Sequence, residues 1–178
     1  MNILVLNGSP KGENSITLQT VRYLEKLYPA HSFEVLHVGQ KIKSLEKDMT
    51  EALAMVSRAD LLLFSYPVYT FIAPSQLHRF IELLKASGAD LTGKAATQLT
   101  TSKHFYDVTA HRYIEDNCHD MGLKVIRGLS ADMDDLLCEK GQKEAKDFFR
   151  YVLWCVKNDH YEPLPAPMEP PVHAPVTI

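Results

Sequence analysis

A loop rich in small and polar residues follows the first apolar run of the chain. The run is Asn2-Ile3-Leu4-Val5-Leu6, and the loop reads Gly8-Ser9-Pro10-Lys11-Gly12-Glu13-Asn14-Ser15-Ile16-Thr17. Its hydroxyl and amide side chains, together with the free N–H groups of an expected helix start, suit a phosphate monoester. The loop lacks the G-x-G-x-x-G pattern of a dinucleotide turn and the Lys of a Walker loop. A Gly/Ser-rich turn with an ordinary helix cap has the same composition, so both interpretations stand for the loop taken alone.

A second loop is unusually apolar for a connection between elements. It reads Tyr66-Pro67-Val68-Tyr69-Thr70-Phe71-Ile72-Ala73-Pro74 and follows the apolar run at residues 60–66. Large apolar side chains between two prolines indicate a surface that is covered by something other than water. A flat aromatic ligand, a neighbouring subunit, or both would cover it, and a loop that only packs against its own domain is the alternative.

A third loop mixes hydroxyl groups, a cation, an imidazole and two aromatic rings. It reads Thr100-Thr101-Ser102-Lys103-His104-Phe105-Tyr106-Asp107. A heteroaromatic ring that carries carbonyl and N–H groups would find both stacking and hydrogen-bond partners here. His104 is either part of such a site or an ordinary surface histidine. The other seven of the eight histidines have no metal-ligand spacing and are interpreted as structural or exposed.

Alternating strands and helices are expected to position these loops. The strands are predicted at residues 2–6, 33–38, 60–66, 95–101 and 123–129, and the helices at 18–28, 48–58, 74–84, 109–121 and 139–158. Ser15 or Asn14 is the expected cap of the first helix, and Gly122 the expected residue after the fourth. This alternation predicts an α/β fold with a parallel sheet between helices on both faces. Five strands in one core favour the doubly wound flavodoxin type, with strand order 2-1-3-4-5.

In such a sheet, ligands bind where the carboxyl ends of the strands meet the following helices. The phosphate-type loop and the two ring-type loops all follow strands, so they are expected at the same edge of the sheet. A phosphate site beside two ring-lining loops would suit a mononucleotide with a large tricyclic base. FMN fits this description better than a dinucleotide does.

Composition excludes several other classes of protein. The chain has 178 residues, 46% hydrophobic and 23% charged, with a net charge of −3. These values predict a folded domain without the basic surface of a nucleic-acid-binding protein, and no apolar run has the length of a membrane span. The N-terminus lacks the pattern of a signal peptide, which favours a cytoplasmic location. The three cysteines, Cys118, Cys138 and Cys155, have no disulfide or metal spacing and are interpreted as buried or neutral thiols.

Six of the ten prolines lie between Pro163 and Ile178. We therefore expect one domain at residues 1–160 and an extended proline-rich tail or linker at 161–178.

Two segments resemble the flavodoxin-like NAD(P)H-dependent FMN reductase family, which includes the flavin domains of iron–sulfur flavoproteins and multimeric flavodoxin-like quinone reductases. The opening Ile3-Leu4-Val5-Leu6-Asn7-Gly8-Ser9-Pro10-Lys11 is similar to that family's strand and "GSPR/K…N-S/T" phosphate loop. The segments Pro67-Val68-Tyr69 and Pro74-Ser75-Gln76-Leu77-His78-Arg79-Phe80-Ile81-Glu82 are similar to its "P-x-Y…P-x-x-L-K-x-F-I-D" ring-side loop and helix. The resemblance extends over residues 1–155.

The resemblance implies a set of FMN-binding residues. Those expected at the phosphate are Ser9, Lys11, Asn14, Ser15, Ile16 and Thr17. Those expected on one side of the flavin ring are Pro67, Val68, Tyr69 and Phe71, and on the other side Thr101, Ser102, Lys103, His104 and Asp107. It also implies two-electron chemistry at the flavin N5 atom, which requires no catalytic acid or base from the protein and no metal. His104 is a candidate for tuning the ring.

This chain departs from the family pattern at two places. Residues 100–107 contain no glycine, whereas the corresponding loop of the family is often rich in Gly-Gly. The family pattern therefore does not determine how this loop holds the flavin ring. The compact cysteine cluster of the iron–sulfur members is also missing, which excludes a four-iron cluster held by this chain's own cysteines.

Two functions follow from the resemblance. The first is an FMN-dependent oxidoreductase that passes electrons from NAD(P)H to flavin, quinone or another small acceptor. The second is an electron-transfer module that exchanges electrons with a redox protein or a fused iron–sulfur domain, and the proline-rich tail favours it. A flavodoxin-like fold whose site binds another anion, or nothing, is the third possibility. A homo-oligomer, dimer or tetramer, formed through the apolar loop at 66–74 is expected with either function.

Overall fold

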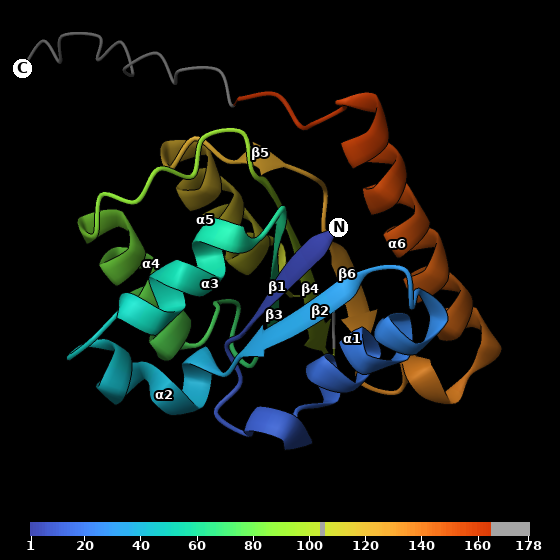
Figure 1. Ribbon diagram of the computed structural model, residues 1–178. Coiled ribbons are helices and arrows are strands. Elements are labelled where there is room, and N and C mark those ends of the chain that lie inside the picture. Colours follow the sequence, from blue (N-terminus) through green and yellow to red (C-terminus); the bar gives the residue numbers. More distant parts are fainter. Residues whose placement is uncertain (104–105, 165–178) are drawn as a thin grey trace, which may run out of the picture.

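A parallel sheet forms the centre of the protein (Figure 1). The computed structural model describes residues 1–103 and 106–164. The strands are β1 (Asn2–Asn7), β2 (Ser32–Leu36), β3 (Leu61–Pro67), β4 (Ala95–Ser102), β5 (Lys124–Val125) and β6 (Leu129–Asp132). They are arranged in the order β2-β1-β3-β4-β5, with β6 also paired to β4, and every pairing is parallel. The predicted strand order is therefore confirmed.

Helices cover both faces of this sheet (Figure 1). The α-helices are α1 (Ile16–Leu27), α2 (Val38–Leu45), α3 (Thr50–Arg58), α4 (Ser75–Ala86), α5 (Val108–Asp120) and α6 (Glu139–Asn158), and two 3-10 turns, η1 (Gly12–Asn14) and η2 (Asp135–Leu137), precede α1 and α6. Apolar side chains of α1 and α6 pack on one face, and those of α2, α3, α4 and α5 pack on the other. Because both faces are covered, β3 is buried along its whole length, which explains why it reads as a continuous apolar run.

The prediction of a single strand at 123–129 was wrong. The edge of the sheet is formed by two short strands, with β5 beside the beginning of β4 and β6 beside its end. Residues 126–128 between them add one residue to the register, since Ala95 is paired with Lys124 and Leu99 with Leu129. Gly128 lies in this interruption, and an added Cβ atom there would lie 2.4 Å from the Gln98 side chain.

The sequence analysis also missed helix α2. Its eight residues follow β2 directly, and Val38 and Leu45 are buried against the core. Gly39 allows the close approach of this helix to the first loop, because an added Cβ atom would lie 2.3 Å from the carbonyl oxygen of Ser9. Val38, Ile42 and Leu45 recur at helical spacing, and their packing against the core stabilises this short helix.

The remaining predictions for local structure agree closely with the observed elements. Ser15 caps α1, since its Oγ accepts a hydrogen bond from the N–H of Leu18 at 3.5 Å. Gly122 follows α5 with a φ of 74°. Cys118 and Cys155 are buried and Cys138 is exposed, and burial raises the pKa of the Cys118 thiol.

After α6 the chain turns back across the edge of the sheet. The N–H of Glu162 donates to the carbonyl of Val125 at 2.8 Å, and Tyr161 packs against the apolar cluster of the α1 and α6 face. The expected tail begins at this attached segment, and its residues 165–178 lie outside the described part of the chain.

None of the helices within residues 1–103 and 106–164 has both the length and the apolar character needed to cross a membrane. Within the same ranges, no group of His, Cys, Asp and Glu side chains is arranged to hold a metal ion.

Candidate functional site

The loops after β1, β3 and β4 meet at the carboxyl edge of the sheet. Asn7 at the end of β1 is paired in register with Ser65, and Pro67 at the end of β3 is paired with Thr101. Two hydrogen bonds continue these pairings into the loops, from the N–H of Gly8 to the carbonyl of Ser65 and from the N–H of Val68 to the carbonyl of Thr101, each 2.9 Å. The register of the sheet thus brings the predicted phosphate and ring residues to one place.

The loop after β1 presents the start of a helix to this edge. Within the described residues, the backbone N–H groups of Ile16 and Thr17 have no hydrogen-bond acceptor. Gly12 has a φ of 55°, in the left-handed region that favours glycine at this turn. Free N–H groups at the positive end of a helix are the donors that bind phosphate.

The start of α1 is connected to the end of β4 by two hydroxyl groups. The Oγ1 atoms of Thr17 and Thr101 lie 2.6 Å apart in a buried position. Sequence analysis assigned Thr101 to the ring, whereas here it contacts the phosphate-type loop. Ser65 faces the α1 side of the sheet by strand alternation, and its buried Oγ has no partner within the described residues.

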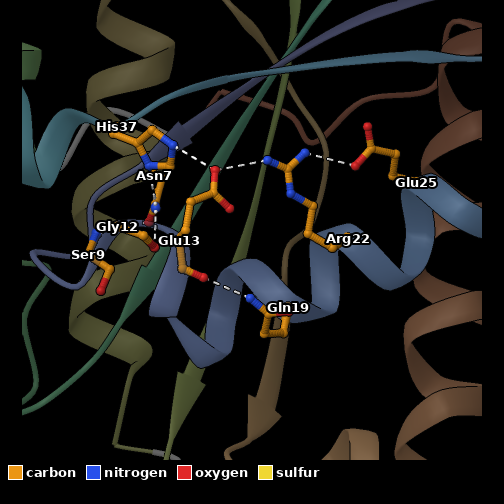
Figure 2. Close-up of polar contacts among 8 residues, drawn as sticks. All are labelled: Asn7, Ser9, Gly12, Glu13, Gln19, Arg22, Glu25 and His37. Carbon is orange, nitrogen blue, oxygen red and sulfur yellow. Dashed lines mark hydrogen bonds and ion pairs between the residues drawn. The ribbon is translucent and has the colours of Figure 1, made fainter.

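Sequence analysis missed the contribution of Asn7 to this loop. Asn7 is fully buried, and its Oδ1 accepts the N–H of Ser9 at 3.1 Å while its Nδ2 donates to the carbonyl of Gly12 at 3.0 Å (Figure 2). These two contacts fold the loop around one side chain. An amide at the end of an otherwise apolar strand was the available sequence signal.

A polar network extends from Asn7 across the outside of the loop (Figure 2). The Nδ2 of Asn7 also lies 3.2 Å from Nδ1 of His37, the residue that follows β2. The other ring nitrogen of His37 contacts the Glu13 carboxylate at 3.0 Å, and Arg22 contacts the same carboxylate oxygen at 3.0 Å. Arg22 further pairs with Glu25 at 2.9 Å. Glu13 is therefore held by two side chains that lie outside the phosphate-type loop.

The loop after β3 exposes a group of large side chains beside the phosphate-type loop. Tyr69, Phe71 and Ile72 are 64%, 53% and 54% exposed. Phe71 has a φ of 63°, in the left-handed region that bulky residues rarely adopt. Its ring lies 5.5 Å from that of Tyr106 in the loop after β4. The two ring-type loops thus present aromatic faces next to each other.

Asp107 has a different environment from the one expected of a ring-lining residue. Its carboxylate is buried and accepts hydrogen bonds from Thr100 at 2.8 Å and from Ser130. Nε2 of His111 lies 3.4 Å from the same oxygen. Asp107 thereby ties together β4, β6 and the start of α5. Burial lowers the pKa of His111, with Asp107 acting against this effect and Arg127 adding to it.

A second buried network lies below this cluster on the α5 face. The hydroxyl of Tyr66 donates to Oε1 of Gln98 at 2.6 Å, and Nε2 of Gln98 donates to Glu115 at 3.1 Å. Burial raises the pKa of Glu115. An open groove of about 660 Å³ runs along the outer side of α5 and, among the predicted site residues that the structure describes, shares only Asp107.

The predicted site residues are therefore placed in three groups. Ser9, Ser15 and Thr17 are buried in the phosphate-type loop, and Lys11, Asn14 and Ile16 are exposed around it. At the ring-type loops, Pro67, Val68, Thr101 and Ser102 are buried, whereas Tyr69, Phe71 and Lys103 are exposed. His104 lies outside the described residues.

The doubly wound sheet and the loops at its carboxyl edge define a flavodoxin-like protein of the mononucleotide-binding type. The chain belongs to the NADPH-dependent FMN reductase family, whose sequence model matches residues 1–130. The expected family, the FMN cofactor and the oxidoreductase class are thereby confirmed at the level of the family. No curated protein sequence gives a significant match to this chain.

Several solved structures share the fold. The apo form of an NADH:FMN oxidoreductase superimposes with a TM-score of 0.71 at 22% identity, covering 86% of this chain and 89% of that one. The flavoenzyme NAD(P)H:(acceptor) oxidoreductase of Paracoccus denitrificans has a TM-score of 0.66 at 19% identity, covering 90% and 99%. An NAD(P)H:quinone oxidoreductase of Methanothermobacter marburgensis has a TM-score of 0.63 at 14% identity, covering 93% and 99%.

The residues of the site fit the chemistry of FMN. The helix start supplies two N–H donors that have no acceptor in the described part of the chain, and Ser9, Ser15 and Thr17 add hydroxyl groups from the same loop. The adjacent aromatic side chains are exposed at the same edge of the sheet, where a flat ring would cover them. Phosphate donors beside an uncovered aromatic surface match the two ends of a flavin mononucleotide.

Proposed function

We propose that this protein binds FMN at the carboxyl edge of its sheet and transfers electrons from NAD(P)H to a small acceptor. The observation that carries the proposal is the convergence of the free helix start of α1 with the exposed aromatic loops after β3 and β4. The family match supports the same chemistry.

In this proposal the loop after β1 binds the FMN phosphate. The N–H groups of Ile16 and Thr17, with the hydroxyls of Ser9 and Ser15, donate hydrogen bonds to it, and the dipole of α1 favours its negative charge. Lys11 is exposed beside the loop and adds a positive charge. The Thr17–Thr101 contact holds this helix start against β4.

The loops after β3 and β4 bind the flavin ring. Tyr69 and Phe71 line one side, and Ser102 and Lys103 line the other, while Asp107 supports the second loop from inside. The flavin, when bound, supplies the two-electron chemistry, so the protein orients the ring and limits the access of water. His104 remains our candidate for tuning the ring.

The acceptor is proposed to be a small molecule such as a quinone or a free flavin. The solved relatives named above are described as acting on FMN, on quinone or on a general acceptor, which supports this class. A supply of NAD(P)H is available in the cytoplasm, where we propose that the protein acts. We also propose that residues 1–160 form the catalytic domain and 161–178 a linker.

Anaerobic spectroscopy tests the proposed function directly. The folded protein should bind added FMN and show a perturbed flavin absorption band, and NADH or NADPH should then bleach that band rapidly. Intact protein that fails to bind FMN would contradict the proposal. Equilibrium dialysis with riboflavin, which lacks the phosphate, is the matched control and should give weaker binding.

An electron-transfer module is the second candidate function. The exposed Tyr69, Phe71, Ile72 and Tyr106 favour it, because they form an apolar surface that a redox protein could contact at the flavin edge. Bleaching by a reduced ferredoxin-type donor, with slow bleaching by both nicotinamides, would select this function over the reductase.

A further inference from the structure

We propose that the neutral imidazole of His37, acting through Asn7, is a positioning group for the phosphate loop, so that FMN binding weakens when this imidazole is protonated. The inference rests on the proposed function and adds to it a positioning residue and its protonation state. His37 belongs to neither sequence motif and reaches the loop from the end of β2.

The orientation of the Asn7 amide is determined by two backbone groups. The N–H of Ser9 can only donate, so the atom 3.1 Å from it is the amide oxygen. The carbonyl of Gly12 can only accept, so the atom 3.0 Å from it is the amide nitrogen. Rotating the amide by a half turn would break both contacts.

This orientation determines the tautomer of His37. Nδ2 of Asn7 carries two hydrogens, of which one points to Gly12 and the other to Nδ1 of His37 at 3.2 Å. Nδ1 must therefore accept, and the ring proton lies on Nε2, where it donates to Glu13 at 3.0 Å. Neutral His37 thus satisfies both of its neighbours at once (Figure 2).

Protonation of Nδ1 would place a donor against a donor. Either the contact between Asn7 and His37 is lost, or the amide turns and the loop loses its bonds to Ser9 and Gly12. Both responses loosen the loop that carries Ser9 and leads into α1. FMN would then have to order the loop when it binds. The free-energy cost of this ordering would lower the affinity of the protein for FMN.

The charges around His37 do not cancel this effect. Glu13 contacts Nε2, and Arg22 lies on the other side of the same carboxylate. The helix that follows His37 carries Lys41 and Lys43, and the backbone N–H of Lys41 donates to the carbonyl of His37 at 2.9 Å. A proton on His37 would attract the negatively charged FMN phosphate. The Glu13 carboxylate, 3.0 Å from Nε2, offsets this positive charge. Its side chain is 58% exposed, so solvent also screens the attraction.

The tautomer can be measured without any flavin. Nitrogen-15 NMR of the apo protein at pH 7.5 should show His37 with a protonated Nε2 and an unprotonated Nδ1. In Asn7→Ala this preference should weaken, because only the Glu13 carboxylate then favours a proton on Nε2. A proton on Nδ1 of the wild-type protein would overturn the inference.

Flavin titrations from pH 7.5 to 5.5 test the consequence for binding. The FMN phosphate has its own ionisation near pH 6, so wild type is compared with His37→Gln, which has no imidazole to titrate. We expect the FMN dissociation constant of wild type to rise about 3- to 10-fold more than that of His37→Gln, the size of one hydrogen bond. Riboflavin should show no such difference, and His160→Gln, remote from the loop, should behave as wild type.

Asn7→Asp supplies a second test that does not depend on loss of binding. The substitution replaces the donor that faces Nδ1 by an acceptor, so protonated His37 now fits better than neutral His37. It also removes the hydrogen bond to the Gly12 carbonyl at every pH, so its pH profile is compared with that of the double variant Asn7→Asp and His37→Gln, which lacks the same bond. The additional pH dependence should therefore change sign, with relatively tighter FMN binding at pH 5.5. Identical pH profiles for wild type and His37→Gln would overturn the inference alone, whereas folded wild type that binds no FMN at pH 7.5 would overturn the proposed function as well.

Discussion

The contact between Thr17 and Thr101 connects the two ends of the candidate site. Their Oγ1 atoms are 2.6 Å apart, although the residues are 84 positions apart in the chain. Both side chains are buried, so each hydroxyl depends on the other for a hydrogen bond. The phosphate loop is thereby attached to the strand that carries a ring-type loop.

Thr17→Val should lower both stability and FMN affinity. The substitution keeps the shape but leaves the buried hydroxyl of Thr101 unpaired, which costs about 1–3 kcal/mol of unfolding free energy. Urea denaturation of the apo protein measures this cost, and FMN titration measures the loss of binding. The control Thr92→Val, at an exposed position, should change the unfolding free energy by less than about 0.5 kcal/mol. Equal stability of Thr17→Val and wild type would show that the hydroxyl pair contributes nothing.

For single residues, the sequence indicated which side chains could cap a helix or bind a ligand. It did not indicate which residues those side chains would contact in the fold. Ser15 and Asn14 were predicted as alternative caps of the first helix, because capping depends on residues within one turn, and Ser15 is the cap. Asn7 and His37 were missed because their contact joins the ends of β1 and β2. That contact exists only after the two strands pair in register.

The loop after β3 holds a strained residue where a ligand is expected. Phe71 has a left-handed backbone, a conformation that costs a bulky residue about 1–2 kcal/mol. Its side chain is half exposed and meets Tyr106 rather than the core. Strain without burial favours a role in binding over a role in stability.

Phe71→Asn should therefore raise stability and weaken flavin binding together. Asparagine tolerates the left-handed conformation, so the apo unfolding free energy should rise by up to about 1 kcal/mol. Loss of the ring should weaken binding of both FMN and riboflavin, since the phosphate is not involved. Tyr69→Asn in the same loop, where the backbone φ is not positive, should give no gain in stability. A fall in stability for Phe71→Asn would contradict this account.

Among the helices and strands, long elements with a clear apolar pattern were predicted well, and short elements were not. Helix α6 was predicted with its observed bounds because its apolar stripe and its length are local properties. Helix α2 and the division of the edge into β5 and β6 depend on the close approaches at Gly39 and Gly128. Such approaches are set by neighbouring elements and leave little trace in a local pattern.

Three partly buried histidines should make the whole fold less stable in mild acid. Burial lowers the pKa of His31, His78 and His111. In the unfolded chain these groups bind protons near pH 6.5, whereas in the folded protein they stay neutral to lower pH. The unfolded state therefore takes up more protons as pH falls, and stability is lost.

We expect a lower unfolding free energy at pH 6.0 than at pH 7.5 in urea denaturation of the apo protein. His111→Gln should reduce this difference, since it removes one of the three groups. The raised pKa of Glu115 acts in the opposite direction at lower pH, so the comparison stops at pH 6.0. A stability that is equal or higher at pH 6.0 would contradict the assignment.

The exposed apolar rim predicts self-association of the molecule. Tyr69, Phe71, Ile72, Tyr106 and Val108 are each more than half exposed at one edge of the sheet. We propose that a second copy covers part of this rim, giving a dimer or tetramer in sedimentation velocity at micromolar concentration. The double variant Tyr69→Ser and Phe71→Ser should sediment as a monomer. The control pair Tyr151→Ser and Trp154→Ser, on the outer face of α6, should leave association unchanged. A wild-type monomer would contradict the proposal.

The class of fold and the types of residue in the loops can be read from local sequence patterns. Apolar runs separated by helical stripes require a parallel sheet covered on both faces, and the residue types that follow those runs suit phosphate and aromatic rings. These properties are local, because each depends on the order of residues within one strand, helix or turn. The FMN expectation followed from them and agrees with the family.

The way the loops are held depends on contacts that form only in the folded protein. Asp107 faces inward to Thr100 and Ser130, Thr101 faces Thr17, and His37 reaches Asn7 across two strands. Each of these contacts joins residues brought together by strand register and by helix packing. A buried polar group must find a partner wherever the fold places one, and that place is a property of the packed sheet rather than of the neighbouring sequence.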